Sequence, residues 1–226
     1  MLTEEAQENK EQQKSPIKAI IFDLDGLLVD SEPIWHAAYE IFLKNHGVVN
    51  KPEVYKKMIG RGLRENMVIA RDELGVKGDV EELLGEIRGI FYSLLSSRRD
   101  VLMQGVIELL QKLDSYKLAV ATGGHTKDKC SQILKNIGID KYFDVVVSSD
   151  DVDKGKPAPD VYLETIRQLG LSSKGCLVLE DAVNGVVAAK SAGIKVFGVN
   201  SNEKIQLELK KAGADKVFVS LGDIEL

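Results

Sequence analysis

The amino-acid sequence predicts an α/β protein with a doubly wound, mostly parallel sheet and an inserted all-helical segment. After residue 100, short apolar runs alternate with helical stretches. Another strand-like apolar segment, Ile17 to Phe22, stands near the amino terminus. Between them, residues 33–101 contain helical stretches and no convincing strand. Strands that alternate with helices form βαβ units, whose strands run parallel, so the core is predicted to be Rossmann-like.

The first predicted strand, Ile17 to Phe22, is nearly all apolar, as expected of a strand buried on both faces of a parallel sheet. Asp23 and Asp25 follow it and would share one face if the strand stayed regular. Gly26 comes next and allows a sharp turn. Open α/β sheets place their ligands at the carboxyl ends of the strands, so the acidic pair is a candidate site. The alternative is a hydrated turn rich in aspartate.

The insert of residues 33–101 opens with a helix that is predicted to start at Glu32-Pro33, since proline suits the first position of a helix. Further helical stretches are predicted at Glu53 to Met58, Leu63 to Leu74 and Val80 to Leu95. Because the insert directly follows the acidic turn, we interpret it as a cap over that turn. The alternative is a plain helical extension.

The rest of the chain alternates strand and helix in order. The predicted strands are Leu118 to Thr122, Phe143 to Ser149, Cys176 to Glu180, Lys195 to Val199 and Lys216 to Val219. The predicted helices begin near Thr126, Pro159, Asp181 and Glu203, and glycine ends the first three of them, as it commonly ends helices. The expected organisation is a polar tail of residues 1–15, a core of residues 16–32 and 102–226, and a cap of residues 33–101.

Composition limits the classes of function. The 226 residues carry a net charge of −5, which argues against nucleic acid as the main partner. The longest apolar runs are strand-sized, and the amino terminus lacks the apolar core of a signal peptide, so we expect a cytoplasmic protein that does not span a membrane. Cys130 and Cys176 are interpreted as small core hydrophobes. No heptad or large apolar seam demands a dimer, so a monomer is expected.

Polar groups follow three more strands. They are Thr122 with Gly123 and Gly124, then Lys156, and then Glu180 with Asp181. Each group alone has a simpler explanation: a turn with Thr126 as helix N-cap, a solvated lysine, or an N-cap at Asp181. Together they place acids, a hydroxyl, bare amides and a lysine at the carboxyl ends of successive core segments.

This combination suits phosphoryl transfer. Converging carboxylates repel one another and need a cation, and all-oxygen ligation favours Mg²⁺. A hydroxyl, glycine amides and a lysine can donate to phosphoryl oxygens. One aspartate can attack phosphorus to give an aspartyl phosphate, and the other can act as general acid and then as base for water.

Four motifs in order resemble those of haloacid dehalogenase superfamily phosphatases, in the β-phosphoglucomutase-like branch with an α-helical cap. They are FDLDGLLVDSE, AVATGG, KGKPAPD and LEDAVNGVVAAKSAG, and the resemblance covers about residues 17–220. It implies Asp23 as nucleophile and Asp25 as acid/base. It implies a Mg²⁺ site of Asp23, the Asp25 carbonyl and Asp181, with Glu180 in or near it. It also implies that Thr122, Gly123 and Lys156 bind the phosphoryl group.

The cap of this chain shows both likeness and departure. GRGLREN, residues 60–66, resembles the family's substrate loop, where Arg61 or Arg64 could grip a second charged group unless they are simply solvated. The cap-helix histidine of the mutases is replaced by Trp35, and the neighbouring His36 is turned by about 100° on a helix. Gln104 replaces a proline at the cap exit, and His125 is interpreted as a loop residue.

The sequence therefore predicts a Mg²⁺-dependent phosphatase of a small phosphomonoester, such as a sugar phosphate, acting through an aspartyl phosphate. An intramolecular phosphomutase is the alternative, and the Trp35 position argues against it. A non-catalytic phospho-receiver is a third possibility. Two features argue against a phospho-receiver: the D-x-D arrangement at the end of the first strand, and an insert of roughly seventy residues, which would be out of place on such a compact domain. The sequence does not identify the ester.

Overall fold

A computed structural model of the protein describes residues 17–58 and 61–225. The predicted polar tail of residues 1–15 lies outside these ranges, and so does Gly60 of the GRGLREN segment.

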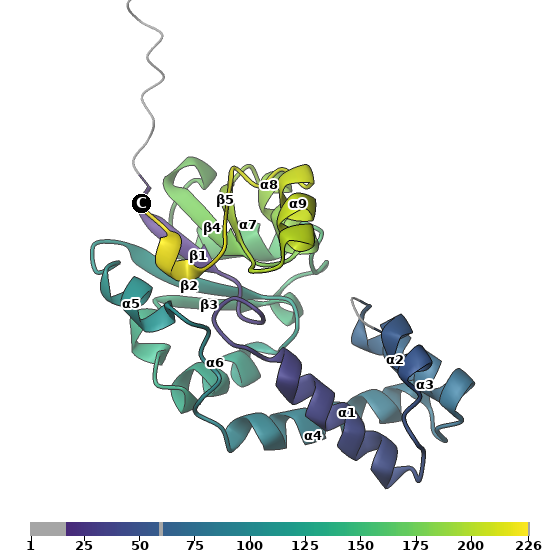
Figure 1. The fold of residues 1–226 in the computed structure, drawn as a ribbon. Helices are drawn as coiled ribbons and strands as arrows, with labels where there is room; N and C mark the ends of the chain where they lie inside the picture. The colour runs from purple at the N-terminus through teal and green to yellow at the C-terminus, as the bar shows by residue number, and fades with distance from the viewer. Residues whose placement is uncertain (1–16, 59–60, 226) are drawn as a thin grey trace, which may run out of the picture.

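The described residues form a sheet of six parallel strands in the order β3-β2-β1-β4-β5-β6. The strands are β1 (Ala19–Phe22), β2 (Lys117–Thr122), β3 (Val145–Ser148), β4 (Cys176–Glu180), β5 (Lys195–Val199) and β6 (Lys216–Phe218). Strand β1 lies in the middle of the sheet, and the later strands are added outward on both sides of it, as Figure 1 shows. The predicted fold class is confirmed.

Helices cover both faces of this sheet. One face carries α5 (Val106–Gln111) and α6 (Lys127–Asn136), and the other carries α7 (Asp160–Leu169), α8 (Val183–Ser191) and α9 (Glu203–Lys211). Side chains alternate along a strand, so Ile20 and Phe22 pack toward the α5 and α6 face, whereas Ala19 and Ile21 pack toward α7 and α8. Because both faces are covered, β1 is buried along its whole length.

Among the described residues, four helices lie between β1 and α5 in the chain. They are α1 (Glu32–Asn45), α2 (Pro52–Met58), α3 (Leu63–Leu74) and α4 (Val80–Ser96). Helices α1 and α4 pack against each other, and the four helices extend away from the sheet layers in Figure 1. We call residues 32–96 of this group the helical segment. The exact division into core and cap stays a prediction.

Short 3₁₀ turns connect several of these elements, at Asp140–Tyr142, Ser149–Asp151, Ser173–Gly175 and Leu221–Asp223. Among the described residues, no helix is both long enough and apolar enough to pass through a lipid bilayer.

Candidate active site

Strand register brings the predicted polar groups to one edge of the sheet. Phe22 in β1 is paired with Val120 in β2 and with Leu179 in β4. The backbone N–H of Asp23 donates to the Leu179 carbonyl at 3.1 Å, so Asp23 leaves the strand beside the end of β4. The carboxyl ends of the three central strands therefore meet at Asp23, Thr122 and Glu180.

Lys156 is the cation at the centre of this edge. Its Nζ lies 2.5 Å from Asp23 Oδ1, 2.6 Å from Glu180 Oε1 and 3.0 Å from the Ala121 carbonyl. The side chain is only 9% exposed, and a buried charge is tolerated when it is paired in this way. Burial lowers the pKa of Lys156, but the carboxylates of Asp23 and Glu180 raise it well above its usual value. The lysine thus stays charged, and the solvated alternative is wrong.

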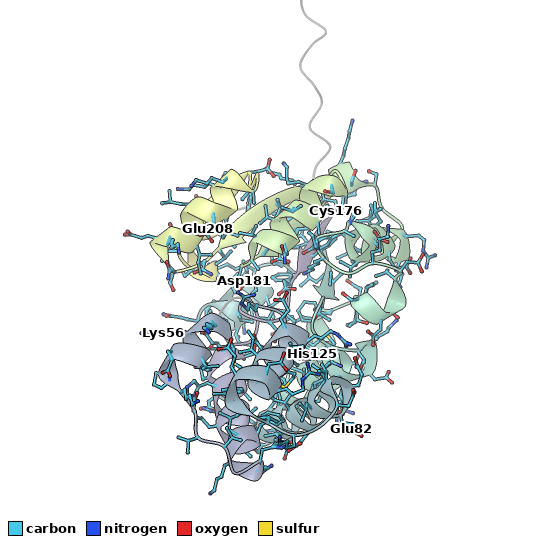
Figure 2. The ribbon with its side chains drawn as sticks, turned by 90° about the vertical axis from the view of Figure 1, so that its right-hand side faces the viewer. Lys56, Glu82, His125, Cys176, Asp181 and Glu208 are labelled. Atoms are coloured by element: carbon cyan, nitrogen blue, oxygen red, sulfur yellow. The ribbon has the colours of Figure 1, made fainter. Side chains whose placement is uncertain are left out.

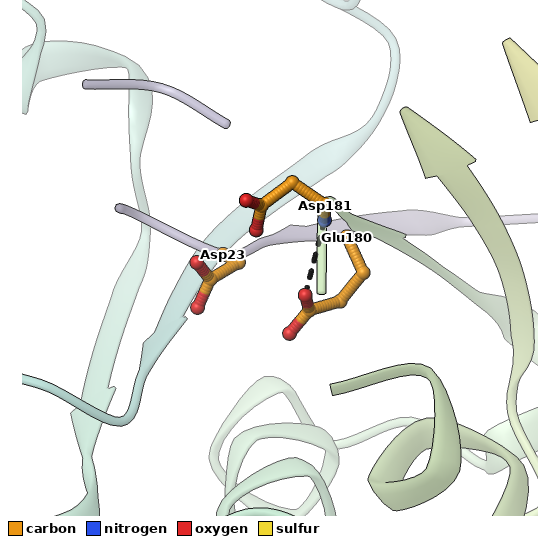
Figure 3. Close-up of side chains that lie close together, drawn as sticks. All are labelled: Asp23, Glu180 and Asp181. Atoms are coloured by element: carbon orange, nitrogen blue, oxygen red, sulfur yellow. Dashed lines mark hydrogen bonds between the residues drawn. The ribbon is translucent and has the colours of Figure 1, made fainter. Parts of the chain in front are cut away.

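Glu180 is held by more partners than the sequence indicated. The Tyr162 hydroxyl donates to Glu180 Oε1 at 2.8 Å. The backbone N–H groups of Asp181 and Ala182 donate to Oε2 at 3.1 and 3.2 Å, and Figure 3 shows the Asp181 bond. Tyr162 escaped the sequence analysis because its position in α7 carries only the signal of a buried helix residue.

Three carboxylates form a candidate metal centre. One oxygen each from Asp23, Glu180 and Asp181 lie within 4.8 Å of one another, as the side chains in Figure 3 indicate. Asp181 is free for this role, because the N-cap of α8 is Ala182. The Asp25 side chain lies outside this group, which agrees with the resemblance implying only its carbonyl.

The charge balance of this cluster favours a bound cation. Burial raises the pKa of Asp23 to about 7, with Glu180 and Asp25 adding to the rise and Lys156 opposing it. Burial also raises the pKa of Asp181 well above its usual value, and the charges of Asp23 and Glu180 add to that rise. These carboxylates therefore share a poorly solvated site in which each charge raises the pKa of its neighbour. Three carboxylate oxygens that repel one another are a ligand set that suits a hard cation such as Mg²⁺.

Asp25 points away from this cluster toward His125. His125 Nε2 lies 2.9 Å from Asp25 Oδ2 and 3.2 Å from Oδ1. Burial raises the pKa of Asp25, but the hydrogen bonds from His125 and Ser31 and the charge of Lys156 help to lower it below its usual value. From the sequence, His125 is interpreted as a loop residue. It does lie in the loop before α6, yet it is buried against the predicted acid/base.

Thr122 and its glycines form the loop beside these acids. Thr122 is fully buried, and its Oγ1 accepts a hydrogen bond from the Gly124 N–H at 3.3 Å. Thr126 caps α6 by accepting from the Lys129 N–H, so the predicted N-cap is present, and phosphate binding by this loop stays a prediction. Gly123 and Gly124 line the cavity described next.

A cavity of about 1210 Å³ lies between the sheet edge and the helical segment. Asp25, Gly123 and Asp181 line it from the sheet side, and Trp35, Tyr39 and Arg64 line it from the helices. Figure 2 shows Asp181 and His125 where the two parts of the molecule meet.

The candidate substrate-contacting residues of the helical segment make contacts with other residues of that segment. Arg64 borders the cavity, where its side chain is 65% exposed and ion-paired with Glu81. Arg61 also borders the cavity, and its Nε donates to the Lys57 carbonyl at 2.7 Å. Trp35 stacks on Phe91 with ring centroids 3.8 Å apart. His36 instead meets the Tyr55 ring edge-on, in keeping with the expected turn away from the site.

Comparison with known proteins identifies the class. The profile of the haloacid dehalogenase-like hydrolases matches residues 20–199. The chain therefore belongs to this family, as the four motifs indicated. The prediction that it is an enzyme, a hydrolase of a family with phosphatase members, is confirmed.

Individual relatives resemble nearly the whole chain. A phosphorylated carbohydrates phosphatase of Thermotoga maritima is 33% identical over 88% of this chain and 92% of its own length. A (DL)-glycerol-3-phosphatase of Arabidopsis thaliana is 31% identical over 94% of this chain and 90% of its own. A crystal structure of a candidate β-phosphoglucomutase from Thermotoga maritima superimposes with a TM-score of 0.78, at 31% identity over 92% of this chain and 96% of that one.

Proposed function

We propose that this protein is a Mg²⁺-dependent phosphatase that hydrolyses a small phosphomonoester, such as a sugar phosphate, through an aspartyl phosphate. The observation that carries the proposal is the convergence of Asp23, Lys156, Glu180 and Asp181 beside a cavity large enough for a small metabolite. The phosphatase relatives support the same reaction class.

The proposed roles follow from position. Asp23, Glu180 and Asp181 would hold Mg²⁺ together with the Asp25 carbonyl. Bound there, Mg²⁺ supplies positive charge against the repulsion between carboxylate and phosphoryl group, about 1 kcal/mol at 4 Å in water and several-fold more when buried. The phosphoryl oxygens would be bound by Thr122, Gly123 and Lys156. Arg64, across the cavity, would contact a second charged group of the substrate.

The reaction has two halves. A carboxylate oxygen of Asp23 attacks phosphorus, and the bond to the ester oxygen breaks while that oxygen takes a proton from Asp25 and leaves as the alcohol. Asp25 then takes a proton from a water molecule, whose oxygen attacks phosphorus and releases phosphate and Asp23. Helices α1–α4 would act as a lid that excludes other water during the first half.

The test is a phosphate-release screen over a broad panel of phosphomonoesters, with and without Mg²⁺. We expect hydrolysis of at least one ester only with Mg²⁺. Asp23→Asn should abolish that hydrolysis, because an amide is a far weaker nucleophile than a carboxylate. Asp114→Asn, at an exposed turn, is the matched control and should leave the rate unchanged. Full activity of Asp23→Asn would refute the mechanism.

A phosphomutase remains the second candidate, favoured by the likeness to the candidate β-phosphoglucomutase. The position of Trp35 argues against it. Adding β-glucose 1-phosphate with a catalytic amount of the bisphosphate separates the two. Glucose 6-phosphate as product would support the mutase, and free phosphate would support the hydrolase.

A further inference from the structure

His125 connects the predicted acid/base to the helical segment. The His125 side chain is only 2% exposed, and each ring nitrogen has one partner residue. Nε2 faces the Asp25 carboxylate at 2.9 Å, and Nδ1 lies 2.9 Å from the hydroxyl of Tyr92 on α4. A buried histidine with both nitrogens engaged has a fixed ring orientation.

Packing also restricts the His125 ring and the Asp25 carboxylate. The Phe91 ring lies almost parallel to the His125 ring, at 19° and with centroids 5.7 Å apart. On the other side, a Cβ atom added at Gly124 would come within 3.1 Å of Asp25 Oδ2. The Asp25 carboxylate is therefore flanked by His125 and the backbone of Gly124, with its remaining surface toward the cavity.

The backbone at Asp25 is not held by regular strand pairing, so side-chain contacts are needed to fix the carboxylate. Strand β1 ends at Phe22, and Asp25 keeps only an isolated bridge to Val29 before the turn at Gly26. The Tyr92 hydroxyl can donate to Nδ1, which leaves the ring proton on Nε2, the nitrogen that faces Asp25. The hydrogen bonds then run in one direction, from Tyr92 through His125 to the carboxylate.

We propose that His125 is a positioning residue that fixes the Asp25 carboxylate for proton transfer to the departing alcohol, and that Tyr92 fixes His125 in turn. The inference rests on the proposed function, since it assumes the acid/base role of Asp25. The contact between His125, in the loop before α6, and Tyr92 on α4 thereby acquires a function.

Two replacements of His125 separate its two contacts. Asn places its amide nitrogen near the position of Nδ1 and cannot reach Asp25, whereas Gln places a donor near the position of Nε2. The probes are phenyl phosphate and p-nitrophenyl phosphate, which have similar size but different leaving groups. Phenolate is the more basic and gains more from a proton. The measured quantity is kcat/KM, which covers the steps up to release of the phenol.

We expect His125→Asn to lower kcat/KM for phenyl phosphate by about tenfold or more, and for p-nitrophenyl phosphate by less than about threefold, as displacement of a general acid predicts. His125→Gln should recover most of the kcat/KM for phenyl phosphate that His125→Asn loses. Tyr92→Phe keeps the ring packing and removes only the hydroxyl. It should also lower kcat/KM more for phenyl phosphate than for p-nitrophenyl phosphate, but by a smaller factor. If the buried His125 variants fail to fold, Tyr92→Phe can still be measured and still tests the proposal.

Equal losses on both esters in the folded variants, or no loss in Tyr92→Phe and His125→Asn, would overturn the positioning role and leave the proposed function intact. Failure of the wild-type protein to hydrolyse either probe or any ester of the panel with Mg²⁺ would instead overturn the proposed function, and this inference with it.

Discussion

Single glycines set how closely the backbone approaches the acidic side chains. A Cβ at Gly26 would collide with the Asp181 carboxylate, and Gly26 also has a φ of 79°, which side chains rarely adopt. A Cβ at Gly185, in the first turn of α8, would collide with the carboxylate of Glu180. Both glycines therefore leave room for proposed metal ligands.

Gly185→Ala tests this close approach without changing the backbone conformation. The methyl group must displace Glu180 from Lys156 and Tyr162, so we expect a loss of about 2–4 kcal/mol in the free energy of unfolding, since overpacking and a disturbed buried ion pair add. Gly89→Ala in α4 is the control, because nothing lies within 4 Å of its added Cβ. It should gain up to about 1 kcal/mol. Urea denaturation measures both, and equal stability of the two variants would contradict the collision.

Site residues at the ends of strands are more predictable from the sequence than those that reach the site from helices or loops. Asp23, Glu180 and Asp181 follow parallel strands, whose carboxyl ends must share an edge, so their meeting could be predicted. Tyr162 and His125 reach the site through side-chain contacts over long sequence distances, at positions that look like an ordinary helix residue and an ordinary loop residue. Their contacts with Glu180 and Asp25 needed the three-dimensional structure.

The helices and strands whose ends carry clear sequence signals were predicted most accurately. The predicted bounds of β4, β5 and α9 match the structure, because polar or glycine residues flank clear apolar patterns. Strand β1 was predicted from Ile17 but begins at Ala19. Helix α5 was missed, since it has six residues and begins after Gly105, whose φ is 87° and whose N-cap offers no side chain.

Helix α4 has the strongest start signal in the helical segment. Asp79 Oδ1 accepts from the Glu81 N–H at 2.8 Å, and the Glu82 carboxylate accepts from the Asp79 N–H at 3.3 Å. We expect Asp79→Ala to cost about 1 kcal/mol of unfolding free energy, because it removes the N-cap acceptor. In a chain of this size that lowers the melting temperature by about 2–4 °C. Asp114→Ala, at an exposed turn, should have no measurable effect, and a similar loss in both variants would contradict the capping role.

The topology of the whole molecule places one helical group over one edge of the sheet. Parallel strands and the alternating rhythm could be read from the sequence, since every crossover contains a helix. The strand order could not, because β1 pairs with β2 and with β4 across long stretches of chain. That order puts the first acidic strand in the middle of the sheet, so the insert that follows it stands over the central site.

Trp35 offers a direct test of movement in this helical segment. It is the only tryptophan of the chain, it lines the cavity from α1, and it is partly buried against Phe91. If the helices close over a bound phosphoryl group, Mg²⁺ with inorganic phosphate should reduce the collisional quenching of Trp35 fluorescence by acrylamide. Asp181→Asn, which lacks a proposed metal ligand, should show no such change, and Trp35→Phe should remove the signal. An unchanged quenching constant at phosphate concentrations that saturate binding by calorimetry would show that the helices do not close on phosphate.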